Sequence, residues 1–131
     1  MIRKNGWEGL LDEFFQANLS RSFQWGEWDC GLFAAGAIQA MTGEDLASEY
    51  RGNYSSALEA AHFGGAERIA ELAGLDEILV GFAGRGDLVL LANDPHDPCL
   101  GILGLDGRAV MVTGSGLAWV DREKVLRAWK V

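Results

Sequence analysis

The chain has 131 residues, 49% of them hydrophobic, with a formal net charge of −8 at pH 7, which fits one acidic domain with a sizeable core. The acidic balance argues against a nucleic-acid-binding surface, because such a surface needs clustered Lys and Arg. The N-terminus lacks the apolar core of a signal peptide, and no apolar run approaches the roughly 20 residues that span a bilayer, so we expect folding in the cytoplasm without membrane insertion.

The first part of the chain, about residues 1–75, has the hydrophobic periodicity of helices. Apolar residues recur at spacings of three and four over residues 7–19, which predicts an amphipathic helix. Residues 31–41 are apolar on nearly every side and mostly small, which predicts a helix packed closely on all sides. Gly43 marks its end.

Three shorter segments follow in this helical half. Residues 44–51 are polar, with room for one helical turn, and residues 54–61 and 66–73 are short amphipathic segments that end at glycines. His62 lies beside the apolar side of the second of these segments. We expect it to be a partly buried structural histidine.

In the second half, about residues 76–131, glycines are frequent and the apolar runs are short. These runs predict an antiparallel sheet with hairpin turns at residues 104–107 and 113–116, and one helical turn with a closing strand over residues 122–129. Helices followed by a strand meander predict a single α+β domain over residues 1–131, with N-terminal helices packed on a C-terminal antiparallel β-sheet. The expected strands are residues 78–80, 88–91, 100–103, 109–112 and 117–120.

One candidate nucleophile lies where a polar, aromatic turn meets the apolar helix. Asp29 is a good N-cap residue, which places Cys30 at the first helical position. There the helix dipole and free amides favour a thiolate and can stabilise an oxyanion. The alternative is that Cys30 is an ordinary small buried residue. The two cysteines are too few for a disulfide scaffold and form no C-x-x-C pair, so neither a structural metal nor another cofactor is expected.

Three patches in order carry a family resemblance: Phe23-x-Trp25-Gly26 with Asp29-Cys30, then Gly86-Asp87-Leu88-Val89, then Leu100-Gly101-Ile102. Together they resemble the NlpC/P60 superfamily of papain-like cysteine peptidases, which cleave cell-wall peptides in bacteria and phages. The resemblance implies a papain-like NlpC/P60 fold and Cys30 as nucleophile. It also implies substrate-binding roles for Phe23, Trp25 and Asp29, with Asp29 suited to the free amine of a peptidoglycan peptide.

The pattern is more closely similar to small proteins encoded among phage tail genes, a branch of that superfamily. This similarity implies a role at the tail tip or in tail assembly, with other tail proteins, such as the hub, as partners. The expected location is then the host cytoplasm during assembly and the virion tail afterwards.

The departures from the family pattern concern the catalytic partners of the thiol. The catalytic histidine of the family falls at Cys99, and the third polar residue falls near Met111. The catalytic set therefore looks degenerate. An imidazole can still come from His96, in the loop before Cys99, with Asp94 or Asp97 to orient it.

Three hypotheses follow. The first is a tail component that keeps the fold without the chemistry. The second is an active cysteine peptidase or amidase that acts on cell-wall peptides, with Cys30 as nucleophile and His96 as base. The third is a Cys30–Cys99 pair that forms a disulfide or, with His96, binds a metal. Asp87 is expected to be a turn or strand-start residue rather than a catalytic one.

Overall fold

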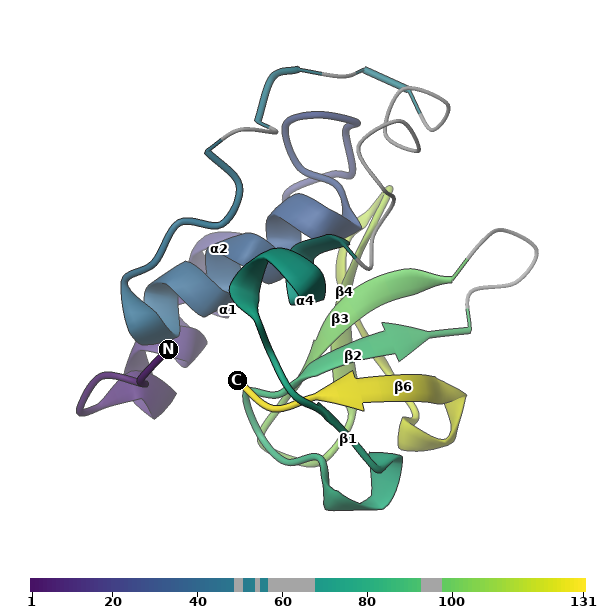
Figure 1. Ribbon diagram of the computed structural model, residues 1–131. Coiled ribbons are helices and arrows are strands. Elements are labelled where there is room, and N and C mark those ends of the chain that lie inside the picture. Colours follow the sequence, from purple (N-terminus) through teal and green to yellow (C-terminus); the bar gives the residue numbers. More distant parts are fainter. Residues whose placement is uncertain (49–50, 54, 57–67, 93–97) are drawn as a thin grey trace.

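The structure is a computed structural model that describes residues 1–48, 51–53, 55–56, 68–92 and 98–131. In these residues, three helices precede a six-stranded antiparallel sheet with the strand order β1-β6-β2-β3-β4-β5 (Figure 1). This confirms the predicted α+β class with helices packed on a C-terminal sheet. The helices are α1 (Trp7–Ala17), α2 (Cys30–Thr42) and α4 (Arg68–Ala73). The strands are β1 (Glu77–Ile78), β2 (Leu88–Leu91), β3 (Cys99–Leu103), β4 (Ala109–Thr113), β5 (Gly116–Val120) and β6 (Val125–Trp129).

Most expected elements are found within one or two residues of their predicted ends. Residues 78–80 are the exception, because β1 stops at Ile78 and a 3-10 turn, η1 (Val80–Phe82), follows. The Arg122 guanidinium donates to the carbonyls of Val80 and Ala83 at 2.7 and 2.6 Å, and these bonds hold η1 against the second 3-10 turn, η2 (Arg122–Lys124). Such a bond between distant segments leaves no periodic signal in the sequence.

Some predictions for the middle of the chain cannot be compared with the structure. Most of the segment 54–61 lies outside the described residues, and so does His62. The polar stretch that begins at residue 44 has turn residues at 46–48, and the Arg51 amide donates to the Ala47 carbonyl at 2.9 Å, which is the i to i−4 spacing of the expected helical turn.

Helix α2 is the centre of the domain, as its uniformly apolar sequence predicts. It packs against α1 on one side and against β3 and β4 on the other (Figure 1). Aromatic rings fill the contact with α1, where Phe14 and Phe15 lie 5.8 and 6.1 Å from the ring of Phe33. None of the helices in the described part of the chain is long and apolar enough to cross a membrane.

Both faces of the sheet are apolar. In β2, Leu88 and Leu90 belong to the main core with α2, whereas Val89 and Leu91 belong to a second cluster on the opposite face. We call this the second cluster. Its buried members are Ala83, Val89, Leu91, Cys99, Leu103, Ala109, Met111, Val125 and Ala128.

A glycine in α2 permits the close approach of the two long helices. A Cβ on Gly36 would meet Phe14 Cζ at 2.8 Å, so the ring lies directly against the helix backbone. We expect Gly36→Ala to lower the free energy of unfolding by about 1–3 kcal/mol, because it overpacks this contact. Gly9→Ala in α1 is the matched control, since nothing lies within 4 Å of its Cβ. It is expected to raise stability by about 0.5–1 kcal/mol, and urea denaturation measures both. If both variants changed the free energy of unfolding by the same amount, the close packing of Phe14 on Gly36 would be contradicted.

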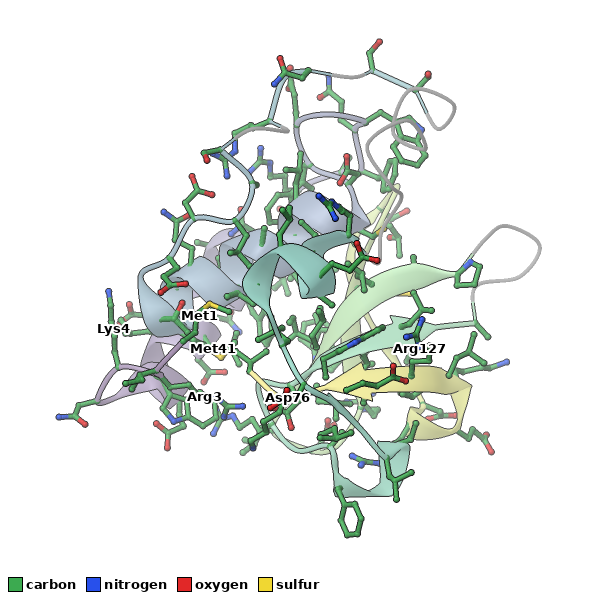
Figure 2. All side chains as sticks on the ribbon, viewed as in Figure 1. Met1, Arg3, Lys4, Met41, Asp76 and Arg127 are labelled. Atoms are coloured by element: carbon green, nitrogen blue, oxygen red, sulfur yellow. The ribbon has the colours of Figure 1, made fainter. Side chains whose placement is uncertain are left out.

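A buried carboxylate joins the two ends of the chain. Asp87 is fully buried, and its Oδ1 accepts from the Arg3 guanidinium at 2.7 Å and from the Val131 amide at 3.1 Å. Its Oδ2 accepts from the Gly84 amide at 2.9 Å. Figure 2 shows the Arg3 side chain on the side of the molecule where both termini lie. Asp87 is therefore the turn residue that the sequence predicts, and it is also half of an internal ion pair.

Candidate functional site

The start of α2 is built as the sequence predicts. Asp29 is the N-cap, and its buried carboxylate accepts from the Leu32 amide and from the Gly26 amide, each at 3.0 Å. Gly26 has a φ of 77°, a conformation that favours glycine, and it ties the preceding turn to the cap. Cys30 is therefore held rigidly at the first helical position. The proposed contact of Asp29 with a substrate amine stays a prediction.

The thiol of Cys30 is less acidic than an ordinary cysteine thiol, whereas its position at a helix start predicts a more acidic one. Burial raises its pKa to about 11, and the negative charge of Asp29 adds to the rise. Backbone hydrogen bonds, chiefly that of Leu100 in β3, act in the lowering direction but do not outweigh burial. The expected preference for thiolate is thus wrong, because desolvation of the charged form exceeds the effect of the helix amides.

The second thiol, Cys99, is close to the first. Cys99 begins β3, opposite Leu91 of β2, and is buried in the second cluster, against which Cys30 also packs. Burial raises the pKa of Cys99 to about 12, and the neighbouring Cys30 raises it further. Both cysteines contribute to the second cluster, and both are free thiols in this structure, so a bond between them or a shared metal stays a prediction.

The third position of the family's catalytic set is also apolar here. Met111 lies in β4, is 8% exposed and belongs to the same second cluster as Cys99. The two positions that the NlpC/P60 resemblance assigns to a histidine and its orienting partner therefore belong to a hydrophobic cluster against which Cys30 packs. A side chain in this cluster can exclude water, but neither residue can accept and return a proton near neutral pH.

The imidazole proposed as an alternative base cannot be placed. His96, Asp94 and Asp97 lie outside the described residues, as does His62, the only other histidine of the chain. The segment that contains His96 joins β2 to β3, which pair at Leu91 and Cys99. The role of His96 therefore stays a prediction.

The two aromatic residues predicted to bind substrate contact one another before the start of α2. The rings of Phe23 and Trp25 are 4.8 Å apart and nearly perpendicular, and both side chains are partly exposed. The Phe23 amide donates to the carbonyl of Thr113 at 2.9 Å, which holds this segment against the hairpin of β4 and β5. The two rings form a packed pair shortly before Cys30 in the chain. Their contact with a substrate stays a prediction.

The whole chain matches one family model. The family is described as Domain of unknown function (DUF6950), and the match covers residues 2–131. The chain belongs to the DUF6950 family. No curated protein matches it in sequence.

The fold of this DUF6950 protein is shared with a solved structure. It is similar to the crystal structure of the NlpC/p60 domain of peptidoglycan hydrolase SagA, with a TM-score of 0.60 and 16% sequence identity. The similarity covers 95% of this chain and 98% of the SagA domain. At this identity the likeness shows the fold alone, and it confirms the predicted NlpC/P60 fold.

In the DUF6950 protein this site presents two protonated thiols beside an apolar cluster. Two thiols can supply two ligands to a soft metal. Within the ranges that the structure describes, however, no three His, Cys, Asp or Glu side chains are grouped to hold one. A metal at this place would need ligands from elsewhere, such as the predicted His96.

Sequence reasoning missed two features of the molecule. One is Arg3, whose guanidinium pairs with Asp87 although 84 residues separate them. The other is a pocket beside Trp28, on which the guanidinium of Arg21 stacks with its carbon 4.3 Å from the ring centroid. Neither feature has a local motif, because each depends on chain segments that only the fold brings together.

Proposed function

We propose that this DUF6950 protein is a component of a phage or prophage-derived tail, at the tail tip or in tail assembly, that keeps the NlpC/P60 fold without its peptide hydrolysis. The observation that supports the loss of chemistry is the buried Cys99 at the position of the family's histidine. A Cys30 thiol with a pKa of about 11 is almost wholly protonated at neutral pH and is a poor nucleophile.

The tail role is supported by the similarity of the sequence pattern to small proteins encoded among phage tail genes. The net charge of −8 suits a partner with a basic surface, such as another protein of the tail hub or tip. Such a protein would assemble in the host cytoplasm and end in the virion tail.

The second candidate is an active cysteine peptidase or amidase that acts on cell-wall peptides. It is favoured by the position of Cys30, which is partly exposed at a helix start, beside backbone groups of Leu100 and Gly31 that act to lower the pKa of its thiol. Backbone amides around a nucleophile can stabilise an oxyanion. This function requires His96 to act as the base.

Co-expression with neighbouring tail proteins tests the two candidates. We expect the protein to co-purify with a tail partner, and Cys30→Ala to leave that complex unchanged, because the thiol has no role in assembly. Purified protein is expected to release no amine from peptidoglycan peptides. Hydrolysis that disappears in Cys30→Ala and in His96→Ala would refute the tail-component proposal and establish the peptidase.

A further inference from the structure

A short segment after α2 closes on itself through an ion pair. The two carboxylate oxygens of Asp45 accept from the Arg51 guanidinium, at 3.2 and 3.3 Å. Asp45 Oδ1 also accepts from the Ala47 amide at 3.0 Å, and the Arg51 amide donates to the Ala47 carbonyl at 2.9 Å. Ala47 is fully buried in the main core, so it fixes this segment to the domain. We call Asp45, Ala47, Arg51 and Gly52 the latch.

The latch is bonded to the turn that precedes Cys30. The Gly52 amide donates to the Gly26 carbonyl at 2.8 Å. Gly26 in turn donates through its own amide to the carboxylate of Asp29, the N-cap of α2, at 3.0 Å. A continuous chain of hydrogen bonds therefore runs from the latch to the start of the helix that presents Cys30.

The bond from Gly52 depends on a backbone conformation that other residues rarely adopt. Gly52 has a φ of 80°, and nothing lies within 4 Å of the place that a Cβ would take. An alanine at this position would therefore meet no neighbour, and its cost would come from the left-handed backbone alone. The bond to Gly26 can thus be weakened without disturbing any packing.

We propose that the latch controls access to the Cys30 thiol. While the latch is closed, the turn stays bonded to Asp29, the first turn of α2 is capped, and Cys30 is only partly exposed. When the latch opens, Asp29 loses its bond from Gly26, and the first turn of α2 can fray and expose the thiol.

Opening of the latch requires little free energy. The side chains of Arg51 and Asp45 are 48% and 30% exposed, and an ion pair in such a position adds only modestly to stability. Access to the thiol does not depend on whether Cys30 is catalytic, so this control is independent of the proposed function.

The rate at which iodoacetamide alkylates Cys30 tests the latch. The Cys99→Ala background leaves Cys30 as the only cysteine. In it, Gly52→Ala is expected to raise the alkylation rate about fivefold to tenfold, because the left-handed backbone is costly for a residue with a Cβ. Gly107→Ala is the matched control, since Gly107 has a φ of 83° and also has nothing within 4 Å of its Cβ position. It has the same backbone cost in the turn between β3 and β4, and it is expected to leave the rate unchanged.

The ion pair provides a second test that keeps every glycine. Asp45→Asn is expected to raise the alkylation rate about twofold to fivefold, because the exposed pair with Arg51 is lost. Asp106→Asn, which breaks the exposed pair with Arg108, is the control and is expected to leave the rate unchanged.

Circular dichroism identifies the variants that are folded, and an increase confined to the two latch variants supports the proposal. The proposal is overturned if folded Gly52→Ala is alkylated at the rate of its background, or if Gly107→Ala accelerates alkylation equally, since the thiol would then be reached by global unfolding. If Gly52→Ala does not fold, the comparison of Asp45→Asn with Asp106→Asn decides, and equal rates for these two overturn the proposal.

Discussion

Asp87→Asn is expected to destabilise the domain by about 3–5 kcal/mol. The substitution keeps the volume of the side chain but removes the charge that faces Arg3, so a largely buried guanidinium loses its carboxylate partner at 2.7 Å. Two backbone amides, those of Gly84 and Val131, also lose a carboxylate acceptor. For a chain of this length the melting temperature should fall by about 12–20 °C, which thermal denaturation measures.

The control for this prediction is Asp106→Asn, which breaks the exposed pair with Arg108. That variant is expected to leave the melting temperature nearly unchanged, because solvent and salt screen exposed pairs. Arg3→Met should reproduce much of the Asp87→Asn effect, and a double-mutant cycle gives their coupling. If Asp87→Asn melts within 2 °C of the parent chain (about the effect of 0.5 kcal/mol), the ion pair does not join the two termini in solution.

Cys30 is expected to be alkylated at neutral pH about thirtyfold more slowly than a free cysteine. With a pKa of about 11 its thiolate fraction is about 300-fold smaller than that of a thiol with a pKa of about 8.5. The greater nucleophilicity of a more basic thiolate recovers about tenfold of this difference. Iodoacetamide labelling of the Cys99→Ala variant, in which Cys30 is the only cysteine, measures the rate.

The pH dependence supplies the second part of this prediction. The labelling rate should climb about tenfold per pH unit and level off only near pH 11, because reaction requires the thiolate. Since the ordinary thiol pKa of 9.0 is raised in the folded state, the unfolded chain loses its thiol protons first. Stability is therefore fully present below pH 9 and falls as the pH rises toward 11 and 12. A rate that levels off near neutral pH would instead indicate a base beside Cys30, and loss of that plateau in His96→Ala would identify it.

Much of the fold could be predicted from local patterns. The apolar run after Asp29 and the glycine at its end predict α2, and the position of Asp29 as N-cap is confirmed to the residue. The strands β2 to β5 follow from short apolar runs between turn residues. β1 was predicted too long because the chain turns at η1, which the Arg122 guanidinium holds in place from about 40 residues away.

The sequence alone determined the helix start that presents Cys30 and the apolar runs of the sheet, and its resemblance to the NlpC/P60 superfamily predicted Cys99 at the position of a catalytic histidine. These features depend on side-chain type and short spacing, which are visible residue by residue. Only the tertiary structure decided that burial raises the pKa of Cys30, that Asp87 pairs with Arg3, and that Arg21 stacks on Trp28 beside a pocket. Desolvation, ion pairing and stacking depend on distances between segments far apart in the chain, and folding sets those distances.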